Sequence, residues 1–229
     1  MLRSRWVPRL LLGAGALALS AAIVSISVGT GGPKVIKLQG GDRVQALLGG
    51  IEEDGADLGP PDAPVTISVF NDLQCSTCDD YEVHTVDPLI EEYARTGKAR
   101  FEFRNYSLGQ AETTKAAYAA VAAGQQDREW QFVELFFRNQ DAAPANTVSE
   151  EFLNDLGNSI TDLDLNTWRK DMESPEVKAR VEADAQLAAD YRLRVSGPSV
   201  VVEGPGGTRV LQDAPSQQDV EDAVPAVGS

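Results

Sequence analysis

The sequence predicts an α/β fold in which a βαβ half and a ββα half flank an all-helical insertion. Residues 65–70, 78–95 and 99–106 have in turn the patterns of a strand, a helix and a strand, a spacing typical of a parallel βαβ unit. Residues 110–193 carry helical patterns throughout. Short β-branched stretches return after Pro198 and precede a last helical stretch.

Side-chain patterns define the βαβ half. The stretch Val65–Phe70 is β-branched and bounded by turn residues, which predicts a buried strand. The 78–95 stretch has apolar residues at helical spacing, and Pro88 inside it is expected to kink the helix. The 99–106 stretch alternates between apolar and charged side chains, which predicts a strand with one buried face.

The remaining elements are indicated by helix starts and turn residues. Ser149 precedes an apolar pair and Pro175 suits a first helical turn. The helices expected in the insertion are 112–125, 129–139, 149–157, 165–172 and 175–193. Residues 199–202 and 208–211 are expected to form a hairpin, and 216–224 a final helix.

Composition narrows the class of protein. The chain has 229 residues, of which 42% are hydrophobic and 24% are charged, as in a globular protein. Its formal net charge of −15 argues against nucleic-acid binding, which needs cationic side chains to neutralise phosphates. With a single histidine, His84, and two cysteines, the chain offers no metal site built on several such ligands, and we expect no metal and no cofactor.

Residues 1–30 differ from the rest of the chain. Three arginines precede the uncharged stretch Leu10–Val28, which at about 1.5 Å per residue approaches the ~30 Å hydrocarbon core of a bilayer. This predicts a single-pass signal anchor, with a cleaved signal peptide as the alternative, and both place the bulk of the chain outside the cytoplasm. The expected layout is 1–30 as the membrane or signal segment, 31–62 as an extracytoplasmic arm or linker, and 63–229 as the folded domain with its insertion at about 110–193.

The motif Cys75-Ser76-Thr77-Cys78 carries the predicted chemistry. It lies between a predicted buried strand and a predicted helix. Unpaired backbone N–H groups and the macrodipole at a helix start stabilise an anion, and the thiolate is the reactive form of cysteine. We therefore expect Cys75 to be the nucleophile and Cys78 to be the resolving cysteine of a redox disulfide.

Two structural interpretations of this motif compete with the redox one. A zinc site would need two more ligands, and His84 is the one remaining histidine or cysteine. A purely structural disulfide across two intervening residues closes a very short loop and constrains the chain little. Both are weaker than the redox interpretation.

The segments APVTISVFNDLQCSTC and PLIEEYARTGKARFEFRNYSL, within residues 63–107, resemble the DsbA-like thioredoxin-fold oxidoreductases. The resemblance continues to VSGPSVVVEG and covers roughly Ala63 to the C-terminus. It implies a thioredoxin fold with the all-helical insertion between its two halves. It also implies that Pro198 is a cis-proline facing the cysteine pair, with Gly197 offering its backbone to a substrate strand.

The chain departs from this family at two places. Several members carry a carboxylate six residues before the first cysteine, where this chain has Val69. Strong oxidants of the family often have Pro and His between the cysteines, where this chain has Ser76 and Thr77. These differences predict a less oxidising disulfide than in the strongest members.

The resemblance implies a thiol:disulfide oxidoreductase that forms disulfides in exported proteins outside the cytoplasm. Its partners would be reduced or unfolded exported proteins, a redox partner that reoxidises or rereduces the pair, and the membrane through Leu10–Val28. Two alternatives stay open. The same chemistry can run as a reductase or isomerase, or the domain can be a redox-silent thioredoxin-fold module that binds peptides.

Overall fold

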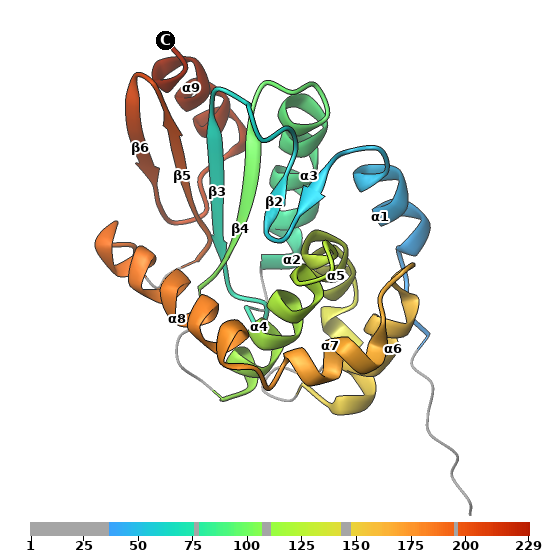
Figure 1. Ribbon diagram of the computed structural model, residues 1–229. Helices are drawn as coiled ribbons and strands as arrows, with labels where there is room; N and C mark the ends of the chain where they lie inside the picture. The colour runs from blue at the N-terminus through green and yellow to red at the C-terminus, as the bar shows by residue number, and fades with distance from the viewer. Residues whose placement is uncertain (1–36, 76–77, 107–110, 143–147, 195–196) are drawn as a thin grey trace, which may run out of the picture. The chain divides into compact units, whose positions relative to one another are not determined.

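The central sheet has the strand order β1-β2-β4-β3-β5-β6 (Figure 1) in the computed structural model, which describes residues 37–75, 78–106, 111–142, 148–194 and 197–229. β3 and β4 are parallel, as the predicted βαβ unit requires, and β6 is antiparallel to β5, as the predicted hairpin requires. β5 is also antiparallel to β3. The strands are β1 (Glu53–Asp54), β2 (Asp57–Leu58), β3 (Thr66–Asn71), β4 (Arg100–Asn105), β5 (Ser199–Gly204) and β6 (Gly207–Leu211).

The helix that follows the cysteine motif is continuous over residues 78–94, and we call it the Cys78 helix. Pro88 lies in the short α-helical stretch Asp87–Leu89, which is flanked by two π-helical stretches of the same helix. The wider turn lets the Asp87 N–H reach the Glu82 carbonyl, and proline and π turns both commonly distort helices. The parts are α2 (Cys78–Tyr81), η1 (Glu82–Val86), α3 (Asp87–Leu89) and η2 (Ile90–Ala94).

The insertion between β4 and β5 is helical, as predicted. Several of its helices begin at residues whose side-chain oxygens accept a backbone N–H of the first turn: Ser149, Asp164 and Ser174. The helices are α4 (Ala111–Gly124), α5 (Glu129–Arg138), η3 (Gln140–Ala142), α6 (Glu150–Ser159), α7 (Leu165–Asp171) and α8 (Pro175–Asp190). The final helix, α9 (Gln217–Val227), has a capping box at Ser216 and packs on β5.

Alternation along the strands divides the core between the two faces of the sheet. One face carries Ile67, Val69, Phe101 and Phe103, which pack with the Cys78 helix, α5 and α9. The opposite face carries Phe70, which packs with residues of α8. The predicted buried face of the 99–106 strand is confirmed, since both phenylalanines have no exposed surface and contact the Trp130 ring.

The segment 31–62, expected as an arm or linker, takes part in the fold. Its described residues form α1 (Gly41–Leu48), β1 and β2. The Asp57–Leu58 strand pairs with β4 and extends the sheet on that side. Residues 1–36, including the predicted membrane stretch Leu10–Val28, lie outside the described residues. Among the residues that the structure describes, no helix has the length and apolar character needed to cross a membrane.

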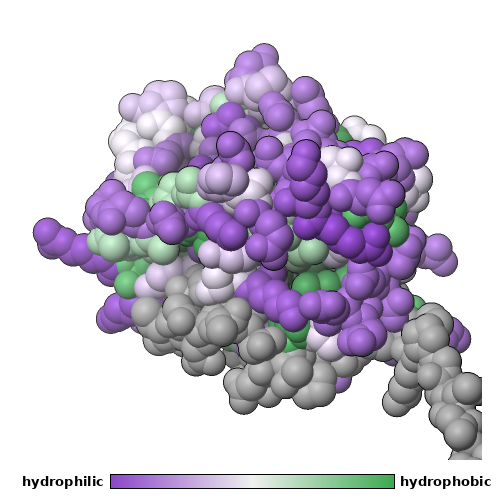
Figure 2. All heavy atoms as spheres, turned by 60° about the horizontal axis from the view of Figure 1, so that its bottom comes forward, coloured by the Kyte–Doolittle hydropathy of each residue, from purple (hydrophilic) through white to green (hydrophobic). Residues whose placement is uncertain are grey.

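The end of the molecule at the bottom of Figure 1 is seen more nearly face-on in Figure 2. Hydrophilic side chains cover most of the coloured surface, and hydrophobic residues show only in small separate patches. Within the described part of the chain, Val210 is the one large hydrophobic residue with an exposed side chain. This surface agrees with the strongly acidic composition.

Candidate functional site

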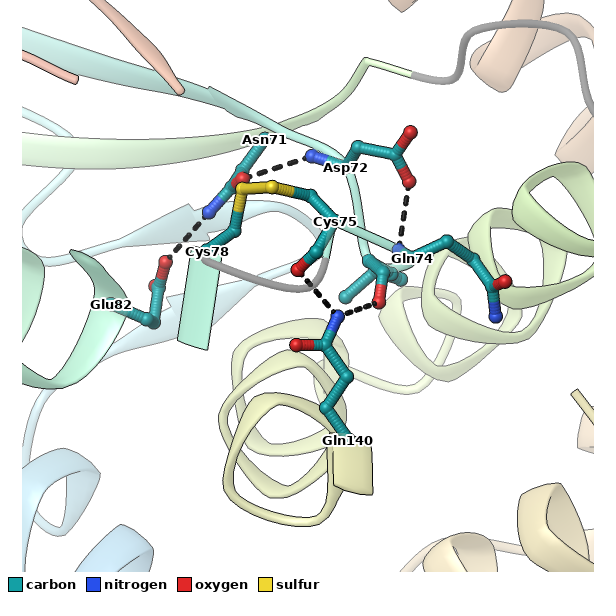
Figure 3. The surroundings of a disulfide bond; sticks show 8 residues. Asn71, Asp72, Gln74, Cys75, Cys78, Glu82 and Gln140 are labelled. Atoms are coloured by element: carbon teal, nitrogen blue, oxygen red, sulfur yellow. Dashed lines mark hydrogen bonds between the residues drawn. A yellow bond between two sulfur atoms is a disulfide. The ribbon is translucent and has the colours of Figure 1, made fainter. Parts of the chain in front are cut away.

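Cys75 and Cys78 form a disulfide at the C-terminal end of β3 (Figure 3). Their Cα atoms are 5.3 Å apart, an ordinary separation for bonded cysteines. The Cys78 N–H donates to the Cys75 carbonyl at 3.2 Å, which closes the turn at the start of the Cys78 helix. Cys75 is half-buried, whereas Cys78 is 1% exposed. Of the two cysteines, Cys75 is therefore the more accessible to solvent.

The turn before Cys75 is built by short polar side chains. Asn71, the last residue of β3, accepts the Asp72 N–H at 2.9 Å with its own amide oxygen. The Asp72 carboxylate accepts the Gln74 N–H at 2.8 Å, and the Asp72 carbonyl accepts the Cys75 N–H at 3.0 Å. Asparagine and aspartate commonly stabilise turns in this way. These contacts hold Cys75 just beyond the C-terminal end of β3.

A side chain of the insertion also holds the turn. Gln140, the first residue of η3, donates from Nε2 to the carbonyls of Leu73 at 2.7 Å and Cys75 at 2.8 Å. Figure 3 shows its amide reaching up to the two carbonyls from the end of the helix below. The residue is half-buried and borders a cleft of about 360 Å³ that also reaches Asp79 and Phe137. We call the turn from Asn71 to Cys75 the redox turn. It is thus held by Gln140, a residue far from it in sequence.

A buried group of charged residues lies one turn along the Cys78 helix. Asn71 donates from Nδ2 to the Glu82 carboxylate at 3.1 Å, and the Glu82 side chain has no exposed surface. From α5, Arg138 makes ion pairs with Glu134 and, at 2.5 Å, with Asp87. We call Glu82, Asp87, Glu134 and Arg138 the acidic cluster. It places three carboxyl groups around a single guanidinium.

Burial keeps the acidic cluster partly protonated. Burial raises the pKa of Glu82 to about 8, and the nearby Asp87 carboxylate adds to this, while the Asn71 hydrogen bond opposes it. Burial also raises the pKa values of Glu134 and Asp87, with the Arg138 guanidinium opposing both shifts. One arginine cannot balance three buried carboxylates, so the cluster holds protons at neutral pH.

The predicted substrate-binding pair, Gly197 and Pro198, lies at the same end of the sheet. The register pairs Ser199 with Phe70, which puts Pro198 level with the end of β3, where the redox turn begins. Pro198 is buried, Gly197 is half-buried, and the Pro198 carbonyl accepts the Ala214 N–H at 2.8 Å.

The expected cis bond at Pro198 is wrong for this structure. The described residues contain no cis peptide bond, so the Gly197–Pro198 bond is trans. Trans is the lower-energy form of an X–Pro bond, and the residues of this chain by themselves never required the other form. The two residues before Gly197, 195 and 196, lie outside the described residues.

Val69 and His84, also singled out from the sequence, do not contribute a charged group to the surroundings of the cysteines. Val69 is buried in the sheet, and it supplies no carboxylate beside the pair. His84 points outward, with 71% of its side chain exposed, and lies 3.3 Å from the exposed Asp80. Ser76 and Thr77 lie outside the described residues.

Sequence reasoning missed Gln140 and the acidic cluster. Gln140 is separated from Cys75 by 65 positions, and no motif links them. A weak signal existed for Glu82, because a carboxylate four residues after Cys78 falls on the same helical face.

Comparison with known proteins agrees with this geometry. The thioredoxin family model matches residues 52–224 of the chain. The chain is 32% identical over 151 residues to a probable disulfide bond formation protein D of Bacillus anthracis, covering 64% of this chain and 69% of the relative. It is similar in structure to a thioredoxin-like oxidoreductase from Silicibacter pomeroyi, with a TM-score of 0.60, 25% identity, and 79% and 95% of the two chains covered. The oxidised BdbD of Bacillus subtilis shares the fold, with a TM-score of 0.62, 21% identity, and 75% and 91% covered.

Proposed function

This chain belongs to the DsbA-like family of thioredoxin-fold proteins and is a thiol:disulfide oxidoreductase, and from that premise we propose how its residues divide the reaction. Cys75 is the sulfur that substrates attack, Cys78 is the resolving cysteine, and the enzyme forms disulfides in exported proteins. The observation that carries the division of roles is the burial of Cys78, of which 1% is exposed, behind the half-buried Cys75.

The reaction proceeds in two exchanges. A substrate thiolate attacks the Cys75 sulfur, the Cys75–Cys78 bond breaks, and Cys78 leaves as a thiolate that takes up a proton. A second substrate thiolate then attacks the substrate sulfur of the mixed disulfide, and Cys75 leaves. The substrate is oxidised by two electrons and the enzyme is reduced by two. A redox partner must then accept these electrons and restore the Cys75–Cys78 disulfide.

Gly197 and Pro198 form the substrate-binding edge in this proposal. They lie at the sheet end where the redox turn begins, which is where a substrate strand would have to pass to present its cysteine to Cys75. The bound strand would pair with backbone groups, since the described surface offers few exposed apolar side chains. Such pairing suits an enzyme that must accept many unfolded chains.

We also propose the arrangement of the chain in the cell. Leu10–Val28 spans the membrane as a signal anchor, or is cleaved as a signal peptide, and the folded domain lies outside the cytoplasm. The domain division is 1–30, 31–62 and 63–229, although α1, β1 and β2 of the middle segment pack on the domain. An externally added protease that digests the domain in intact, wall-stripped cells would support this topology. Protection of the domain in such cells would contradict it.

The experiment that tests the direction of the reaction is equilibration of the full chain against glutathione. A reduction potential near about −120 mV marks a donor of disulfides, and a potential near about −270 mV marks a reductant. We expect the disulfide to be oxidising, but less oxidising than that of the strongest donors, because no cationic residue lies between the cysteines. A pair that exchanges with nothing would instead indicate a redox-silent peptide-binding module.

A further inference from the structure

Three consecutive residues at the end of α5 each hold a different part of the molecule. Arg138 pairs with Asp87 of the Cys78 helix. Asn139 accepts the Gln39 N–H at 2.7 Å and donates to the Gln39 carbonyl at 3.0 Å, which fixes the segment before α1. Gln140 donates to the carbonyls of Leu73 and Cys75. Of these three, Gln140 alone contacts the redox turn directly.

We propose that Gln140 is a positioning residue of the redox site, through which the helical insertion sets the stability of the Cys75 thiolate. This rests on the proposed role of Cys75 as the attacked and attacking sulfur. It gives the insertion a part in the chemistry.

The geometry supplies the reason. The Cys75 carbonyl accepts two donors, the Cys78 N–H at 3.2 Å and the Gln140 amide at 2.8 Å, which together fix the direction of that carbonyl. The Leu73 carbonyl accepts a hydrogen bond from the same amide at 2.7 Å. Both oxygens, one of Cys75 itself and one two residues before it, carry partial negative charge, and the Gln140 N–H groups offset that charge. Because thiol–disulfide exchange releases Cys75 as a thiolate, this offset stabilises the product of reduction more than the disulfide form.

The closing experiment compares Gln140→Met with Asn139→Ala in the full chain. Methionine keeps the length of the side chain and removes both donors. For Gln140→Met, we expect the equilibrium constant against glutathione to move about fivefold toward the enzyme disulfide, the effect of one ordinary hydrogen bond. A thiolate absorbance titration of the reduced protein should move in the same sense, with the thiolate appearing at higher pH.

Asn139→Ala is the matched control. It removes three hydrogen bonds, to the Gln39 N–H, the Gln39 carbonyl and the Leu135 carbonyl, so it should destabilise the fold at least as much. It leaves the Gln140 amide in place and should keep the wild-type equilibrium constant. An unchanged constant in Gln140→Met, or an equal change in Asn139→Ala, would overturn the proposal.

A second variant keeps the test valid if Gln140→Met does not fold. Gln140→Lys retains N–H donors and adds positive charge, so the constant should stay at the wild-type value or move toward the reduced enzyme. Movement toward the disulfide would contradict the proposal. Failure of the proposed function itself gives a different result, because the wild-type pair would then not exchange with glutathione at all.

Discussion

The side-chain amide of Asn71 donates to the Glu82 carboxylate at 3.1 Å, and this contact joins the end of the central strand β3 to the helix that carries Cys78. The same asparagine accepts the Asp72 N–H at the start of the redox turn. A single residue therefore connects the turn to the acidic cluster. The protonation of that cluster should consequently affect the folding stability of the whole domain.

The first prediction concerns the pH dependence of stability. Glu82 has a pKa of about 8 in the folded protein against an ordinary 4.5, so between these values the folded state holds a proton that the unfolded state has released. Stability should therefore fall as the pH rises from about 5 to 8. Glu82→Gln should flatten this decline, as followed by urea unfolding across that pH range.

The control for this prediction is Glu151→Gln, which changes an exposed carboxylate of α6. It should keep the wild-type pH profile. If Glu82→Gln also keeps it, the proton of the acidic cluster resides on another carboxyl group, such as Glu134.

The second prediction concerns the single cation of the acidic cluster. Arg138→Met should lower the free energy of unfolding by about 3–5 kcal/mol, because it leaves buried carboxylates without their partner. The loss should be larger at pH 8 than at pH 5, where the carboxyl groups are more fully protonated. Arg169→Met, at an exposed position of α7, should change stability by less than about 0.5 kcal/mol. Equal losses at the two pH values would contradict the role given to Arg138.

The third prediction separates the two cysteines. Cys78→Ser, incubated with disulfide-bonded substrate proteins, should accumulate mixed disulfides, because the accessible Cys75 thiolate attacks the substrate disulfide and no Cys78 thiol remains to displace the bound substrate. Cys75→Ser should accumulate few, since the remaining thiol is buried. Non-reducing gel electrophoresis after acid quenching measures the amount of mixed disulfide that each variant forms. More mixed disulfide in Cys75→Ser than in Cys78→Ser would reverse the assignment.

Local patterns were sufficient to predict most of the framework. The β-branched run before the cysteines forms β3, and the alternating run after the Cys78 helix forms β4, parallel to it. Each of these elements is defined by residues close together in the chain, so periodicity and turn residues reveal them. Ser149 and Pro175 marked helix starts for the same reason, since capping is a local interaction.

The features that sequence could not predict depend on distant partners. β1 and β2 have two residues each inside a Gly- and Pro-rich stretch, and β2 is a strand because it pairs with β4. Arg138 had the ordinary pattern of a basic residue at a helix end, and its partner Asp87 lies 51 positions away. The cis bond expected at Pro198 came from a family resemblance, and the structure has trans there.

The end of α5 has a consequence for how this chain can vary in length. Adding or removing one residue within α5 would rotate its last residues by about 100°, and Arg138, Asn139 and Gln140 would lose their partners together. Among the described residues, the hydrogen bonds that the insertion gives to the Leu73 and Cys75 carbonyls come from Gln140, which precedes α6, α7 and α8. We therefore expect natural insertions and deletions among homologues to fall between α6 and α8, while the number of residues in α5 stays constant.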